Sequence, residues 1–477
     1  MNPLQPDREK TAIVVGGGVA GMSAACALAE AGLYVKLIER RGYLGGRASS
    51  YRHPGVNEVI DNCQHVLFGC CTNLMGFYRR IGVADRIHWT NSMTMMEPGG
   101  QMTRLSSSRW LPAPLHGLPS LLAAKAFTRD DKKALMRAFR AFMRPVPAES
   151  TETLGQWLKR NGQTPGAISR FWRLVIASAL NADVDEIALP YAAKVIRELF
   201  LNSAEAGAMG MSTVPLSELY DGAEHYLRKR GGEVLFNASV EGAAWDEETS
   251  QWTLTTRAGD QVADFLVLAL PFEATSKLLL LMPPADGAEI LANQIAQQHH
   301  GPICSVHLWF DREITDLDHA VLLDREIHWM YNKTRLQPWR KEKGSYLELV
   351  VSASQEFAAL SREEAIELSL RELVEFFPSA GEAKLEKAAL VKEVRATFTV
   401  PPGIDAWRPA SVSPWPNCVL AGDWIQTGWP STMESAARSG HLAAEVVCTV
   451  IGKQVSFLVP DLKRRGVMRF VKTATSL

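Results

Sequence analysis

Residues 11–21, Thr-Ala-Ile-Val-Val-Gly-Gly-Gly-Val-Ala-Gly, decide the fold of this chain. The run at 11–15 is apolar and stops at three glycines, which is typical of a buried parallel strand. Small and apolar residues at helical spacing follow over 19–32. Residues 33–39 then alternate as a second strand, so this part of the sequence predicts a βαβ unit.

Three of these glycines, Gly16, Gly18 and Gly21, have the G-x-G-x-x-G spacing of a dinucleotide-binding turn. The first allows the sharp turn out of the strand, and the second allows the backbone to approach a pyrophosphate. The third lets the helix pack on the strand. The helix begins near Val19 and Ala20, where its partial positive charge is expected to face the phosphates.

Charged residues follow this turn at the spacing that a dinucleotide requires. Glu39 ends the second strand, where its carboxylate would accept hydrogen bonds from the ribose hydroxyls and repel a 2′-phosphate. We expect the next residue, Arg40, at the same site. A second glycine turn at Gly45, Gly46 and Arg47 predicts another backbone approach to the pyrophosphate, with the guanidinium as a forked donor.

The order strand, G-x-G-x-x-G, strand, Glu and Gly-Gly-Arg resembles the flavin amine oxidase and phytoene desaturase superfamily, in which the dinucleotide is FAD. The resemblance implies that the Val240 backbone meets the adenine. It also implies that Gly422 and Asp423 lie at the flavin, where the carboxylate reaches the ribityl chain. The backbone at Thr432 and Met433, at the start of a last helix, is expected at the flavin O2 edge.

A narrower resemblance comes from residues 61–67, Asp-Asn-Cys-Gln-His-Val-Leu, together with 111–116 and 395–398. These segments resemble the hydroxysqualene dehydroxylases, FAD enzymes of bacterial squalene and hopanoid synthesis. The resemblance implies that Gln64 and His65 line the isoalloxazine. His65 is the candidate catalytic residue, as a hydrogen-bond donor or acid at the substrate hydroxyl. The alternative is a histidine that only positions the loop.

The implied reaction is the reductive removal of the hydroxyl of hydroxysqualene, which gives squalene. Loss of the hydroxyl as water leaves an allylic cation, and reduced flavin supplies hydride to it. The partners would be a long-chain isoprenoid substrate and a reductant that the sequence does not identify. The alternatives are a carotenoid-type desaturase, in which hydride moves in the opposite sense, an amine oxidase, and a non-redox carrier of prenyl lipids.

The predicted fold class is α/β, with a Rossmann-like FAD-binding domain assembled from discontinuous segments and an inserted α+β substrate domain. Helices are expected over 120–143, 165–182, 215–230, 361–376 and 432–451, and strands over 233–245, 252–257, 263–270, 303–310, 345–352 and 418–422. The predicted domains are 1–80, 210–285 and 405–453 for FAD, 81–209 and 286–404 for the substrate, and a tail at 454–477.

Composition excludes several other classes of protein. The formal net charge of the 477-residue chain is −1, so no overall field recruits nucleic acid, and no such partner is expected. The seven cysteines are odd in number and form no C-x-x-C pair, which argues against a disulfide framework or a zinc site. The pair His299-His300 lacks further ligands at metal spacing and is predicted to be exposed, so no metal is expected.

Two segments suggest contact with a membrane surface. Residues 110–127 are apolar and interrupted by prolines, as in a buried lid or an entrance that dips into lipid. The tail interleaves apolar residues with Lys463, Arg464, Arg465, Arg469 and Lys472, a pattern typical of a helix on anionic lipid or of a solvated tail. We expect a cytoplasmic protein that lies peripherally on the inner face of the cytoplasmic membrane.

Overall fold

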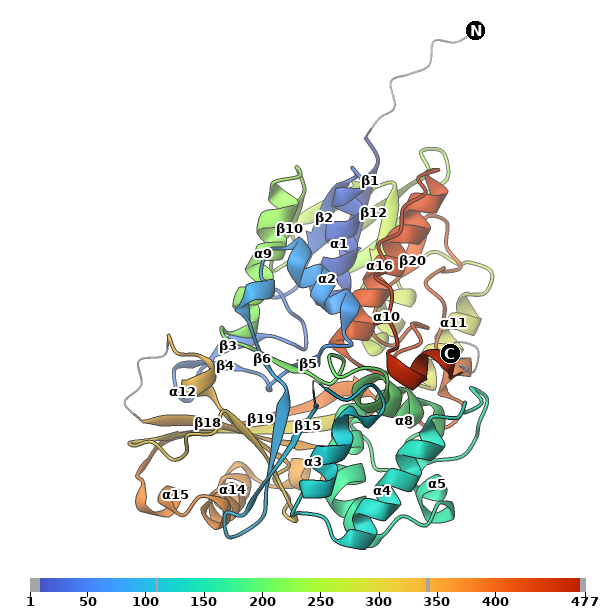
Figure 1. Ribbon diagram of the computed structural model, residues 1–477. Coiled ribbons are helices and arrows are strands. Elements are labelled where there is room, and N and C mark those ends of the chain that lie inside the picture. Colours follow the sequence, from blue (N-terminus) through green and yellow to red (C-terminus); the bar gives the residue numbers. More distant parts are fainter. Residues whose placement is uncertain (1–8, 109, 340–343, 472–477) are drawn as a thin grey trace.

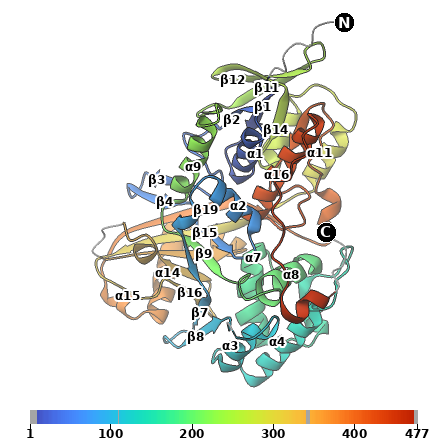
Figure 2. The ribbon, with the colours of Figure 1, turned by 45° about the horizontal axis from the view of Figure 1, so that its top comes forward.

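The computed structural model describes residues 9–108, 110–339 and 344–471. Figure 1 shows two lobes: one contains a parallel sheet with its helices, and the other contains a broad sheet beside a group of helices. The same two lobes are seen from a second direction in Figure 2. The predicted α/β class is therefore confirmed.

The first lobe is built on a five-stranded parallel sheet with the strand order β10-β2-β1-β14-β20. The strands are β1 (Thr11–Val15), β2 (Tyr34–Ile38), β10 (Glu233–Leu235), β14 (Phe265–Leu268) and β20 (Cys418–Leu420). They come from three separated parts of the sequence, as predicted. Val15 is in register with Ile38 and Leu268, so the loops that follow these strands meet at one edge of the sheet.

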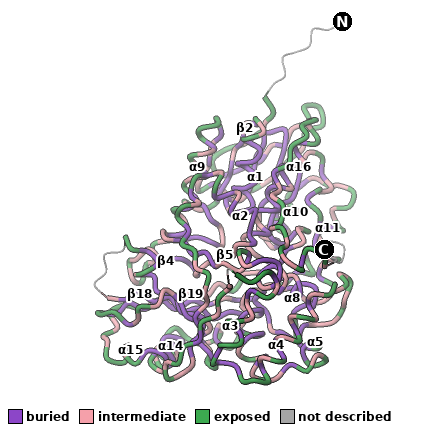
Figure 3. The backbone as a smooth tube through the Cα atoms, viewed as in Figure 1, coloured by how far each residue is buried: buried purple, intermediate pink, exposed green. Residues whose placement is uncertain are grey.

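Two helices of this lobe pack closely together. They are α1 (Val19–Glu30), which is almost entirely buried (Figure 3), and α16 (Met433–Val450). A Cβ at Gly440 would lie 2.3 Å from the Ala20 carbonyl oxygen, so only glycine permits this approach. The remaining elements of the lobe are α2 (Thr72–Arg80), α9 (Leu216–Arg228), α10 (Phe272–Leu279), α11 (Ala288–Ala296), β11 (Val240–Asp246), β12 (Gln251–Thr256) and β13 (Gly259–Ala263).

The second lobe contains a seven-stranded sheet with the order β19-β15-β18-β17-β16-β7-β8. The strands are β7 (Ser92–Met96), β8 (Met102–Ser106), β15 (His300–Phe310), β16 (His319–Leu322), β17 (Trp329–Asn332), β18 (Ser345–Ser352) and β19 (Leu385–Phe398). One face packs on α14 (Arg362–Phe376) through an apolar core that includes Leu308, Leu349 and Leu373. The helix begins with the predicted capping box of Ser361 and Glu364.

Short strands join the two lobes, and helices complete the second one. The strands are β3 (Ser50–His53), β4 (Glu58–Asp61), β5 (Val66–Phe68), β6 (Ile87–Thr90) and β9 (Met209–Ser212). The helices are α3 (Leu118–Ala123), α4 (Arg129–Phe142), α5 (Leu154–Arg160), α6 (Pro165–Ala167), η3 (Ile168–Ala177), α7 (Ser178–Leu180), α8 (Leu189–Ile196), η4 (Arg197–Leu201), α12 (Lys333–Leu336), α13 (Gln355–Ala359) and α15 (Ser379–Glu382). The 3₁₀ turns are η1 (Ala84–Arg86), η2 (Leu115–Gly117), η5 (Ile404–Trp407) and η6 (Gly466–Phe470).

Some predicted elements differ from the structure. The helix expected over 120–143 is two helices, because Thr128 caps α4 through Asp131 and so starts a new helix. The strand expected over 233–245 is interrupted between β10 and β11. The long strand β19 was not predicted, because its burial does not alternate regularly between inside and outside.

The C-terminal tail is not the lipid-bound helix considered in the sequence analysis. Residues 454–465 form an extended strap over the first lobe, followed by the short turn η6. The Glu445 carboxylate accepts the Phe457 and Leu458 N–H groups at 2.6 and 2.8 Å, and Asn73 Oδ1 accepts the Val459 N–H at 2.8 Å. The strap is thus anchored by partly buried hydrogen bonds. Residues 472–477, and Lys472 with them, lie outside the described residues.

Candidate functional site

A cavity of about 1190 Å³ runs from the edge of the parallel sheet into the second lobe. This volume exceeds the ~300–1,000 Å³ usual for one small ligand, so the cavity has room for a dinucleotide and a second molecule. Its wall contains the predicted residues Gly16, Gly18, Val19, Ala20, Glu39, Arg40, Gly45, Gly46, Arg47, Gln64, His65, Val240, Gly422, Asp423, Thr432 and Met433. Gly21 lies behind this wall in α1. The structure therefore brings the predicted site residues together.

The first turn of α1 forms a cradle for a phosphate group. Gly18 precedes helix α1. No side chain caps the helix, and its first turn carries no acidic residue, so the N–H groups of this turn remain available to a ligand. A Cβ at Gly18 would meet no protein atom within 4 Å. The space beside this glycine is therefore left for a ligand, which is what close approach of a pyrophosphate requires.

The carboxylate of Glu39 is held beside this cradle. Its two oxygens accept the Gly17 N–H and the Arg41 N–H, both at 2.8 Å, and the side chain is buried. Each carboxylate oxygen has a further lone pair for a ribose hydroxyl. Glu39 thus has a second role that the sequence did not reveal, because it also fixes the glycine turn.

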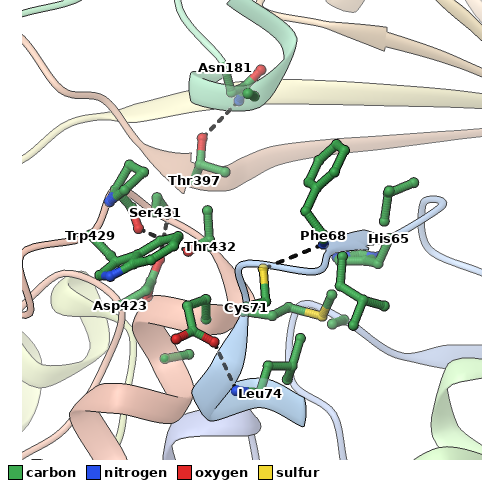
Figure 4. A pocket seen from close by; sticks show the side chains of 18 of the residues that line it. His65, Phe68, Cys71, Leu74, Asn181, Thr397, Asp423, Trp429, Ser431 and Thr432 are labelled. Atoms are coloured by element: carbon green, nitrogen blue, oxygen red, sulfur yellow. Dashed lines mark hydrogen bonds between the residues drawn. The ribbon is translucent and has the colours of Figure 1, made fainter. Parts of the chain in front are cut away.

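Two predicted cofactor residues contact each other. The Arg47 guanidinium forms an ion pair with Asp423 and donates a hydrogen bond to the Ala396 carbonyl at 3.1 Å. Asp423 also accepts a hydrogen bond from Ser431. Figure 4 shows Asp423, Ser431 and Trp429 on the side of the cavity opposite His65. The ion pair joins the second glycine turn to the C-terminal motif, although the sequence analysis predicted a phosphate partner for Arg47.

His65 lines the cavity, and its ring is held by its own loop. Nδ1 lies 2.8 Å from the Cys63 carbonyl oxygen, which can only accept, so Nδ1 carries the proton. Burial lowers the pKa of His65 below its ordinary value, although the bond to Cys63 opposes this shift. The neutral ring therefore presents Nε2 as a proton acceptor. The predicted role as a donor would need a protonated ring, which burial disfavours.

Beyond this loop the cavity wall is mostly apolar. It is formed by side chains of α3, α4, η2 and η3 and by Met143, which follows α4. The residues of these elements are Leu115, Leu118, Leu121, Met136, Phe139, Phe171 and Val175. Leu115 and Val467 line the cavity and are also 48% and 53% exposed, so the cavity reaches the surface there. The wall suits a long hydrocarbon that enters from this side.

Several neighbouring residues have roles that sequence patterns did not indicate. Trp429 lines the cavity, whereas Trp424 is buried elsewhere and donates its indole N–H to the Leu270 carbonyl at 2.9 Å. The prediction that His300 is exposed is wrong. Its Nε2 lies 3.1 Å from the Glu273 carboxylate, and its ring stacks on Phe272.

The buried lysine Lys333 was also missed. It donates to Gln64 Oε1 at 2.7 Å and pairs with Asp61 at 2.6 Å and Glu348 at 3.4 Å. Lys333 and Asp61 are 272 positions apart, and no local pattern in the sequence could have linked them.

Comparison with known proteins identifies relatives of this chain. The family model for flavin containing amine oxidoreductases matches residues 19–448. The 15-cis-phytoene desaturase of Synechococcus elongatus is 26% identical over 456 residues, 91% of this chain and 95% of that protein. The enzyme of the same name from an Oncidium hybrid cultivar is 26% identical over 96% of this chain and 81% of its own length. A solved structure of putrescine oxidase bound to putrescine superposes with a TM-score of 0.69 at 16% identity, covering 94% of this chain and 100% of that one, which shows the shared fold.

Proposed function

Because the chain belongs to the family of flavin containing amine oxidoreductases, and is therefore an FAD-dependent oxidoreductase, we propose that it exchanges hydride with a long isoprenoid chain. The observation that carries this proposal is that the glycine cradle and an apolar tunnel belong to one continuous cavity. When bound, FAD supplies a two-electron centre at the junction. Family membership leaves no place for the non-redox carrier considered in the sequence analysis.

The comparisons favour desaturation over dehydroxylation as the direction of the reaction. The relatives described above are phytoene desaturases, in which hydrogen is removed from an isoprenoid hydrocarbon. Such a step needs a group that takes up a proton, and His65, which lines the cavity, has an unprotonated Nε2. We therefore propose a carotenoid-type desaturase with His65 as the base.

Reductive dehydroxylation of hydroxysqualene remains a second candidate, favoured by one observation. His65 places a polar ring on a wall that is mostly apolar beyond it. A substrate hydroxyl would give the His65 ring a hydrogen-bond partner, whereas a plain hydrocarbon would not. Product analysis separates the candidates. Oxidised enzyme should convert phytoene to a more unsaturated product, while conversion of hydroxysqualene to squalene by reduced enzyme alone would establish the second candidate instead.

The cofactor end gives a separate prediction for Glu39. Glu39→Ala should weaken FAD binding about 10–100-fold, because charged hydrogen bonds worth roughly 1.5–3 kcal/mol are lost and the Gly17 turn loosens. Titration of apoprotein with FAD measures this effect. Glu39→Gln, which keeps the shape of the side chain, should lose less. An unchanged dissociation constant in Glu39→Ala would remove this carboxylate from the site.

We further propose that the tunnel mouth lies on a membrane surface. The Val467 N–H donates to the Ala113 carbonyl at 3.1 Å, so η6 and the segment at 110–117 form one surface. Trp110 and Phe470 on this surface are 94% and 82% exposed, and Arg465 and Arg469 are exposed beside them. Exposed aromatic groups next to cations suit anionic lipid. Within the described ranges, no helix has the length and apolar character to cross a bilayer.

Replacing Trp110 and Phe470 together by serine should reduce co-sedimentation with anionic vesicles by at least about tenfold, since two large apolar side chains leave the interface. FAD content should not change, because neither residue lines the cavity. Ile290→Ser is the matched control, as Ile290 is 66% exposed on α11 and away from the tunnel mouth. Equal sedimentation of the double variant and the native protein would refute the membrane contact.

A further inference from the structure

A buried ion cluster lies directly behind the cavity wall. Lys333, Asp61 and Glu348 are 1%, 3% and 0% exposed, and they come from α12, β4 and β18. The Lys333 ammonium lies 2.6 Å from Asp61 Oδ2 and 3.4 Å from Glu348 Oε2. One cation therefore faces two carboxylates in a region without solvent, where the desolvation cost of the charges can exceed their mutual attraction.

The cluster extends to the wall through a single side chain. Lys333 donates to Gln64 Oε1 at 2.7 Å, which orients the amide so that its Nε2 donates to the His65 carbonyl at 3.2 Å. Both Gln64 and His65 line the cavity. The same loop is tied to the large sheet a second time, because Ser305 Oγ donates to the Asn62 carbonyl at 3.1 Å.

The two carboxylates differ in their surroundings. Burial alone would raise the pKa of Asp61, but the charge of Lys333 and hydrogen bonds from Lys333, Ser50 and the Leu216 N–H hold it below its usual value. Burial raises the pKa of Glu348 to about 7, and the positive charge of Lys333 only partly offsets this shift. The surroundings thus favour the ionised form of Asp61 and the protonated form of Glu348.

Other titratable groups face Glu348 from β17, from the loop and from β15. Burial raises the pKa values of Tyr331 on β17 and of Cys63 in the loop well above their usual values. On β15, His307 is the neighbour of Glu348 in register, and its ring nitrogens contact Ser305 Oγ at 3.1 Å and the Tyr346 hydroxyl at 2.8 Å.

We propose that Lys333 is a positioning residue that fixes the Gln64 amide at the flavin, and that ionisation of Glu348 loosens this hold. The placement of the flavin beside Gln64 rests on the proposed function. Neutral Glu348 leaves Lys333 to Asp61 and Gln64. Ionised Glu348 competes for the ammonium and adds a negative charge behind the wall, which disfavours electron uptake by the cofactor.

The test is the reduction potential of the bound flavin as a function of pH, which requires no substrate. The native protein should show a change of slope near pH 7, with the potential falling more steeply above it. Glu348→Gln should lose this change, because the side chain cannot ionise. Ser305→Ala is the matched control: it cuts the other tie of the loop without altering charge, and it should keep the change of slope. If the change of slope in the reduction potential persists in Glu348→Gln, the proposal is overturned.

A second measurement separates this proposal from the proposed function and avoids the cofactor. Folded Glu348 keeps its proton up to a higher pH than the unfolded chain does, so its contribution to stability falls as pH rises from the ordinary glutamate pKa toward 7. In apoprotein, this loss should be smaller for Glu348→Gln. Equal pH dependence of the melting temperature in both proteins would contradict the assigned ionisation.

Lys333 itself is tested by two substitutions. Lys333→Met should change the visible spectrum of the flavin and lower its potential, and Lys333→Arg should restore part of both, since the cation is retained. A native spectrum and potential in Lys333→Met would overturn the positioning role. Where Lys333→Met does not fold, the Glu348→Gln measurements decide alone, because that variant leaves the Lys333 and Asp61 charges balanced.

Discussion

Replacing Gly21 by alanine is expected to give protein that retains no FAD after purification. A Cβ at this position would lie 1.9 Å from the Gly16 carbonyl oxygen, a distance that no side chain tolerates. Helix α1 must therefore move away from β1, and its first turn leaves the phosphate position. Overpacking of this kind typically destabilises a protein by about 1–3 kcal/mol, so the apoprotein should also melt at a lower temperature.

Gly18→Ala should weaken cofactor binding without changing the stability of the fold. The added methyl group meets no protein atom, so the apoprotein should melt as the native apoprotein does. FAD affinity should still fall by about tenfold or more, because the methyl group occupies the space for the pyrophosphate. The decisive comparison is the apoprotein melting temperature against the FAD dissociation constant in both variants. Full FAD affinity in Gly18→Ala would show that the cradle does not hold the cofactor.

His65→Phe should slow the substrate-dependent reduction of the flavin by about 10²–10⁴-fold, the usual worth of a positioned acid or base. The reaction needs Nε2 unprotonated, so the native rate should fall as pH drops through a pKa below the ordinary 6.5. Stopped-flow absorbance under anaerobic conditions measures this single turnover.

FAD content of His65→Phe should remain, since the phosphate and ribose contacts lie elsewhere on the wall. His53→Phe on β3 makes the same chemical change outside the cavity and should react at the native rate. A native rate in His65→Phe would remove the proton-transfer role and leave His65 as a residue that shapes the loop.

The parts of the fold that sequence predicts are those with strong local signals. The residues from Thr11 to Gly21 predict a strand, a turn and the start of a helix, and the capping box at Ser361 predicts the start of another helix. The tail misled prediction, because apolar and basic residues alternate in a helical pattern although Glu445 and Asn73 hold it extended. Tertiary hydrogen bonds there override local periodicity.

The candidate site divides in the same way. Backbone contacts to a dinucleotide need glycines at fixed spacing, so the sequence predicts the cradle around Gly18. Ion pairs between side chains that are far apart in the sequence follow no fixed spacing. The ion pairs of Arg47 with Asp423 and of Lys333 with Asp61 join residues that are hundreds of positions apart, and only the assembled sheets bring them together.

The central claim, hydride exchange between FAD and a long isoprenoid chain, is tested most directly with a deuterated substrate. Oxidised protein is mixed anaerobically with phytoene deuterated at the bond to be desaturated, and flavin absorbance and product mass are followed. We expect that the flavin is bleached, that the rate shows a deuterium isotope effect, and that the product has lost deuterium. Three results together would contradict the central claim. The flavin stays oxidised with phytoene, hydroxysqualene does not reoxidise the chemically reduced flavin, and phytoene does not protect the flavin from bleaching by an amine.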